Sequence, residues 1–138
     1  RIAAMNPEAD REQAVANNYD VKYNERKIQN LRSEDLIAST NATLEDARNK
    51  VYNSLKTQYN AVLDAKDALD AANIKLQLET VSMNAASAKA ATGNISALEL
   101  IQQQTSYTTA KNSVETGKMQ LTLAMEKYDW IKKGLTFS

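Results

Sequence analysis

The 138-residue sequence contains no cysteine, no histidine, one proline and three glycines. Without cysteine and histidine, the chain has no disulfide bond, thiol nucleophile, histidine acid–base catalyst or zinc site of the usual kinds. The scarcity of proline and glycine leaves few places for turns, which favours long helices. No apolar run reaches the ~18 residues of a membrane-spanning helix. We therefore expect an elongated helical protein, and no membrane insertion by this segment.

Acidic and basic residues balance, with 17 of each interspersed along the chain. A nucleic-acid partner would require a basic face, so none is expected. Asp64, Asp67 and Asp70 share one side of a helix and could ligate a hard cation, but such a row beside Lys66 is more often solvated. Catalysis by paired carboxylates would require a cleft that raises one pKa, which a helical rod does not offer. We expect no cofactor, no metal and no enzymatic activity.

Two long segments repeat large side chains at every seventh position, the signature of a coiled coil. They are separated by the chain's strongest break, which contains Gly93. Smaller or polar residues lie three positions after each large one. The predicted seam residues that carry the pattern are Leu55, Val62, Leu69, Leu76 and Met83 in the first segment, and Leu100, Tyr107, Ala110, Val114, Gly117, Leu121, Ala124 and Tyr128 in the second.

If the chain folds back at Gly93, large seam residues face small ones: Leu69 faces Gly117, and Val62 faces Ala124. Matched volumes at each layer are what a packed interior requires. We therefore predict an all-α fold, a long antiparallel coiled-coil hairpin plus one N-terminal helix. The expected single elongated domain spans 1–138, with helices at about 7–38, 43–91 and 96–133 and a tip at 92–95.

Local signals set the expected helix ends. Asn6 precedes Pro7 at a helix start, and Ser96 is placed to cap the last helix, which Gly134 should end. A slip in the apolar phase predicts a turn or kink between Ser39 and Thr43. Two interpretations remain for the polar seam residues facing each other, Glu79 and Tyr107: the tyrosine hydroxyl donates to the carboxylate, or this side of the hairpin is wet and lines a tube.

The stretch 88–102 resembles the periplasmic hairpin tip of TolC-like outer-membrane efflux proteins. It has Gly93 at the turn, then the short stretch Asn94-Ile95-Ser96-Ala97, and then Glu99 and Leu100 at the start of the returning helix. The segment 14–21 is similar to the family's opening helix, with Tyr19 in place of a proline. No segment alternates as a β-strand would, so the resemblance covers an α-barrel element only. The family's first hairpin also has no counterpart here.

The resemblance implies a structural part of an efflux or secretion duct in the periplasm and outer membrane. The duct would be a homo-oligomer, a trimer in family-like form, that docks by its tips to the periplasmic adaptor (membrane-fusion) protein of an inner-membrane pump. Glu99 and Gln102 would line the aperture. The residues that would contact the adaptor are Thr92, Gly93, Asn94, Ile95, Ser96 and Ala97.

Two alternatives remain: an autonomous soluble helical bundle that serves as a scaffold or adaptor, and a surface or secretion-apparatus coiled coil unrelated to efflux. A bulky residue at Gly93 should abolish adaptor docking only in the duct. A stable trimer in solution likewise favours the duct, and a strict monomer favours the bundle.

Overall fold

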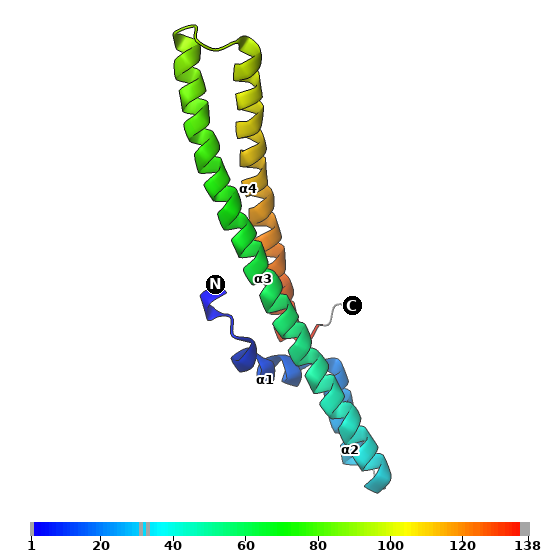
Figure 1. The fold of residues 1–138 in the computed structure, drawn as a ribbon. Coiled ribbons are helices and arrows are strands. Elements are labelled where there is room, and N and C mark those ends of the chain that lie inside the picture. Colours follow the sequence, from blue (N-terminus) through cyan, green and yellow to red (C-terminus); the bar gives the residue numbers. More distant parts are fainter. Residues whose placement is uncertain (1, 31, 33, 136–138) are drawn as a thin grey trace. The chain divides into compact units, whose positions relative to one another are not determined.

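The structure, a computed structural model, describes residues 2–30, 32 and 34–135. A short 3-10 turn, η1 (Ile2–Ala4), is followed by four helices: α1 (Pro7–Asn17), α2 (Tyr19–Asn30), α3 (Glu34–Ala91) and α4 (Ala97–Lys132) (Figure 1). No strand occurs among the described residues. The expected all-α class is confirmed, and α3 packs on α4. Within this part of the chain, no helix combines the length and the apolar character needed to cross a membrane.

The chain divides into two compact units. The first unit comprises Arg1–Leu63 and Leu123–Ser138, and therefore holds α1, α2, the first part of α3 and the end of α4. The second unit, Asp64–Thr122, holds the rest of α3 and α4 and the turn between them.

In the second unit, α3 and α4 run antiparallel and are joined by the turn after Ala91 (Figure 1). Gly117 lies against Leu69, the pair that folding back at Gly93 predicts: a Cβ at Gly117 would come within 3.2 Å of Leu69 Cδ1. All the predicted seam residues of this unit are buried or half-buried. They are Leu69, Leu76, Met83, Leu100, Tyr107, Ala110, Val114, Gly117 and Leu121.

Glu79 in this seam has a polar partner other than Tyr107. It accepts a hydrogen bond from Gln103 Nε2 at 2.9 Å. Of the two interpretations given for Glu79 and Tyr107, the hydrogen bond from the tyrosine hydroxyl is not found among the described residues. The flexible amide of Gln103 reaches the carboxylate, so this half-buried charge has a polar partner.

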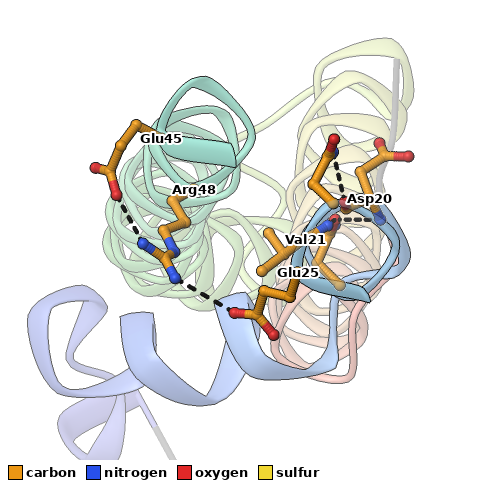
Figure 2. Close-up of polar contacts among 7 residues, drawn as sticks. Asp20, Val21, Glu25, Glu45 and Arg48 are labelled. Atoms are coloured by element: carbon orange, nitrogen blue, oxygen red, sulfur yellow. Dashed lines mark hydrogen bonds and ion pairs between the residues drawn. The ribbon is translucent and has the colours of Figure 1, made fainter. Parts of the chain in front are cut away.

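The first unit contains the largest fully buried side chains of the described residues, namely Tyr128, Leu55, Val21 and Val62. Gln58 donates to the Ala124 carbonyl at 2.9 Å, and the rings of Tyr59 and Tyr128 lie 6.3 Å apart. Arg48 of α3 pairs with Glu45 at 2.6 Å and reaches Glu25 of α2 at 3.3 Å (Figure 2). This unit therefore joins α2 to α3 by an ion pair as well as by apolar packing.

The prediction of one helix over 7–38 is wrong, because the chain breaks at Asn18. Asn18 is extended, with φ −73° and ψ 133°, and its Oδ1 accepts from the backbone N–H groups of Asp20 and Val21 (Figure 2). This is an N-cap for α2. In a continuous helix, these N–H groups would bond to the carbonyl groups four residues earlier. The Asn18 side chain offers them an alternative acceptor, so the first helix can end and a new helix can begin at this residue.

The predicted turn between Ser39 and Thr43 is also wrong, because α3 begins at Glu34 and runs through this segment without interruption. Thr43 Oγ1 donates to the Ser39 carbonyl at 3.2 Å, and Thr40 is buried. A hydroxyl that bonds to the carbonyl four residues earlier is compatible with a helix. The cap-prone composition of this segment therefore does not end the helix.

The end of α4 agrees with the prediction. Gly134 has φ +98° and donates to the Ile131 carbonyl, while the Leu135 N–H reaches the Trp130 carbonyl at 3.0 Å. These two bonds form a Schellman motif, which requires a left-handed residue that glycine supplies most easily. Asn17 Nδ2 donates to the Lys132 carbonyl at 3.0 Å, so the end of α1 is bonded to the end of α4.

Candidate functional site

The turn between α3 and α4 begins with a second Schellman motif. Gly93, with φ +73°, donates to the Ala90 carbonyl at 3.1 Å, and the Asn94 N–H donates to the Lys89 carbonyl at 2.8 Å. Thr92 Oγ1 also donates to the Lys89 carbonyl, and Asn94 Nδ2 donates to Thr92 Oγ1. The last carbonyls of α3 are therefore satisfied within the turn, and the tip has a defined conformation.

A capping box starts α4. Ser96 Oγ accepts from the Glu99 N–H at 3.1 Å, and the Glu99 carboxylate accepts from the Ser96 N–H at 3.2 Å. The expected N-cap is thus confirmed, and its partner is the acid predicted to line an aperture. Glu99 and Gln102 are both exposed, so their side chains remain open to solvent. Their role in an aperture stays a prediction.

The tip residues predicted to contact an adaptor are presented to solvent. From Thr92 to Ala97 all are exposed except Ile95, which is half-buried. No atom outside the turn lies within 4 Å of a Cβ built on Gly93. Beside the tip, Leu98 and Ile101 on the first turns of α4 are 65% and 57% exposed. The tip therefore combines a rigid polar turn with uncovered apolar side chains.

A second feature of this hairpin was missed by the sequence analysis. Two residues beyond each seam position, both helices of the second unit carry an exposed row without a single charged residue. We call these the outer rows. The outer row of α3 is Ala71, Ile74, Leu78, Val81, Ala85 and Ala88, and that of α4 is Leu98, Gln102, Thr105, Thr109, Asn112, Thr116 and Met119.

The outer rows have the same seven-residue period as the seam, which is the signal that could have revealed them. On α3 the row is apolar throughout, and Ile74, Leu78 and Val81 are 59%, 64% and 68% exposed. A residue two positions away lies about 205° around a coiled-coil helix, so each outer row is nearly opposite the seam. Each helix of the second unit thus has two opposite contact faces, the seam and the outer row, of which the other helix covers only the seam.

A polar cluster in the first unit was also missed. The Tyr128 hydroxyl donates to Asp10 Oδ2 at 2.6 Å, and Lys132 Nζ lies 3.2 Å from Asp10 Oδ1. Burial alone would raise the pKa of Asp10. Hydrogen bonds from Tyr128, the Asn6 N–H and Lys132 lower the pKa by more than burial raises it, so the pKa lies below its ordinary value. Burial and Asp10 raise the pKa of Tyr128. This cluster holds α1 against α4.

An open groove of about 920 Å³ runs along α2 and α3 in the first unit. Its lining mixes charges of both signs, including Lys27, Asp46 and Lys50, and two of these form the ion pair Lys50–Asp46. Among the described residues, no group of three or more carboxylates is placed to hold a metal ion. We take the hairpin of the second unit as the candidate site, because it carries the exposed tip residues and the uncharged outer rows.

Comparisons with protein-family models, with curated proteins and with solved structures each find no match to this chain.

Proposed function

We propose that this chain is a structural component of a TolC-like efflux or secretion duct in the cell envelope. Its hairpin forms part of the duct wall, and its tip docks to a periplasmic adaptor protein. The observation that carries the proposal is the outer row of α3, a continuous apolar face nearly opposite the seam. The resemblance of the tip segment to that family points in the same direction.

The outer rows support lateral assembly with further copies of this chain. A helix with one apolar stripe needs one neighbour, whereas a helix with two opposite stripes needs a neighbour on each side. The α3 row presents Ile74, Leu78 and Val81 to solvent over a stretch that contains no charge. Uncovered apolar area of this kind is the usual mark of an interaction surface.

The two outer rows also complement each other. The row of α3 is apolar, and that of α4 is uncharged. Between Leu98 and Met119, the α4 row has three threonines, whose methyl groups are apolar, and the amides Gln102 and Asn112. Packing one against the other buries no unpaired charge, which would be costly. Repetition of this contact from copy to copy builds a continuous wall of alternating α3 and α4 helices.

Assembly is tested by native mass spectrometry of the wild-type protein and of two matched α3 variants. Leu78→Lys places a charge in the outer row, and Gln77→Lys places the same charge at the neighbouring exposed position. We expect an oligomer for wild type and Gln77→Lys, and a monomer with unchanged helical circular dichroism for Leu78→Lys. A wild-type chain that stays monomeric at high concentration would overturn the proposal and favour a self-contained bundle.

Docking at the tip is tested at Gly93, where the environment offers open space but the backbone is left-handed. Asparagine tolerates this conformation, whereas a β-branched residue does not. We expect Gly93→Asn to retain cross-linking to a periplasmic adaptor protein in the envelope and Gly93→Val to lose it. Equal cross-linking of both variants would remove the tip from the docking site.

A further inference from the structure

We infer that the hairpin face bearing Lys75, Ser82, Lys89, Glu99, Ser106 and Ser113 is the concave, solute-facing side of the wall, and that it favours hydrated anions over cations. We call this the inner face. The inference rests on the proposed function and adds to it which side lines the passage and which class of solute that side suits.

The angle between the seam and the outer row of each helix determines how a wall of these helices curves. At 3.5 residues per turn, each residue advances by about 103° around the axis. The centre of the outer row then lies about 155° from the centre of the seam on one side of the helix and about 205° on the other. The two neighbours of a helix therefore do not lie in one plane with it.

The same angle distinguishes the concave side of each helix from its convex side. In a curved wall, the directions from a helix to its two neighbours enclose less than 180° on the concave side. The 155° side is therefore concave, and it holds one residue per seven, the residue just before each large seam position. On α3 these are Ala68, Lys75, Ser82 and Lys89, and all four are exposed.

The concave sides of α3 and α4 lie on the same side of the hairpin. On α4 the corresponding residues are Glu99, Ser106, Ser113 and Gln120, which are also exposed. In an antiparallel pair related by twofold symmetry, equivalent heptad positions flank the seam on the same side. The concave sides of α3 and α4 therefore coincide, and the hairpin has a single inner face.

The chemistry of the inner face follows from these eight residues. It has three hydroxyl groups, one amide, one small apolar side chain, two lysines and one glutamate, a net charge of +1 from two positive and one negative groups. Near the tip, Lys89 and Glu99 offset each other, and Glu99 is further bound to the Ser96 N–H. Away from the tip, Lys75 is the only charge, so repeated copies create a positive ring in that part of the passage.

The chain offers a clean test because it contains no cysteine. Ser82→Cys places a thiol on the inner face, and Ser87→Cys places one on the convex side of the same helix; both serines are exposed. In the assembled full chain, we expect a maleimide bearing a large polyethylene glycol to label Ser82→Cys several-fold more slowly than Ser87→Cys. In the monomeric Leu78→Lys background, the two rates should converge.

The solute class is tested on the same thiols with small methanethiosulfonate reagents of opposite charge. Residues seven apart on a helix lie about 10 Å from each other, so at low salt the charge of Lys75 acts on position 82. We expect the ratio of the rate with the anionic reagent to the rate with the cationic reagent to be higher at Ser82→Cys than at Ser87→Cys, and to fall several-fold when Lys75→Glu is added.

The outcomes separate the two proposals. A monomeric wild-type chain overturns both the wall and the inner face. An assembled chain in which Ser82→Cys reacts with the bulky reagent as fast as Ser87→Cys, or faster, overturns the face assignment and leaves the wall intact. If the bulky reagent labels Ser82→Cys slowly, but the ratio of anionic to cationic reagent rates does not change when Lys75→Glu is added, the preference for anions is overturned.

Discussion

At the scale of single residues, Asp10 of α1 makes two polar contacts with α4. It accepts from Tyr128 at 2.6 Å and pairs with Lys132 at 3.2 Å. Its pKa is lowered in the folded state, so it contributes stability that is complete above the unfolded pKa of about 3.9 and is lost as the pH falls toward the folded value.

Asp10→Asn should therefore lower the free energy of unfolding at neutral pH by about 1.5–3 kcal/mol, the usual range for a hydrogen bond to a charged group. The difference from wild type should shrink as the pH falls below about 4, because the unfolded wild-type chain then takes up a proton that the native carboxylate, with its lowered pKa, does not. Urea unfolding at a series of pH values measures both effects. Asp64→Asn, on an exposed part of α3, is the control and should change neither; a pH-independent loss at Asp10 would contradict the linkage.

The two left-handed glycines differ in what surrounds them, and this predicts different costs. A Cβ at Gly134 would lie 2.1 Å from the Asn17 carbonyl oxygen, whereas a Cβ at Gly93 meets open space. Gly93→Ala should cost only the backbone strain of about 1–2 kcal/mol. Gly134→Ala should cost clearly more, because the end of α1 must also move. Thermal unfolding compares the two, and equal melting temperatures would refute the close approach.

At the scale of elements, the break between α1 and α2 depends on one cap. Asn18 is 3% exposed, and its Oδ1 accepts from two N–H groups at the start of α2. Asn18→Ala should cost about 0.5–2 kcal/mol, the range for loss of an N-cap, and Asn18→Ser should recover part of it because serine also caps. Urea unfolding measures this. If serine were no better than alanine, the capping contact would not be the source of the loss.

The seam of the hairpin depends on the closeness of Gly117 to Leu69. A Cβ there would lie 3.2 Å from Leu69 Cδ1 and 3.5 Å from Leu69 Cα. Gly117→Ala should be close to neutral, because about 1 kcal/mol of helix propensity offsets a small shift of the leucine side chain. Gly117→Ile should destabilise by about 1–3 kcal/mol, because the backbone of Leu69 blocks the larger side chain. Denaturant unfolding that ranks isoleucine equal to alanine would contradict this packing.

At the scale of the whole molecule, deep burial is unevenly distributed between the two units. The largest fully buried side chains, Tyr128, Leu55, Val21 and Val62, belong to the first unit, whereas the buried apolar residues of the second unit are Ala86, Ala110 and Val114. Small buried side chains contribute less transfer free energy. The second unit therefore buries less apolar surface of its own, as expected if further copies pack against it as proposed.

Hydrogen exchange measured by mass spectrometry should show this difference. In dilute protein, amides of 71–88 and 98–119 should exchange faster than those of 51–62, because a weakly buried hairpin opens locally at lower cost than the core. On assembly, the same two segments should gain protection. Gain in 51–62 alone would place the interface outside the outer rows.

The sequence by itself determined the hairpin. The seven-residue seam, the left-handed turn at Gly93, the Ser96 cap and the Gly134 stop all depend on residues close together in the chain, so periodicity and capping rules suffice to locate them. The outer rows were equally readable, since they repeat the seam two positions later. They are missed when only one apolar face is assigned to each helix.

Tertiary structure alone decided how the first unit is held together. Asp10 and Tyr128 are 118 residues apart, and Gly134 lies against Asn17. Neither contact can be predicted from the spacing of residues that are close together in the sequence. The break at Asn18 and the uninterrupted start of α3 were misjudged because asparagine, serine and threonine can cap a helix or bond within one. Which of these occurs depends on what packs around the segment, and that is a property of the folded chain.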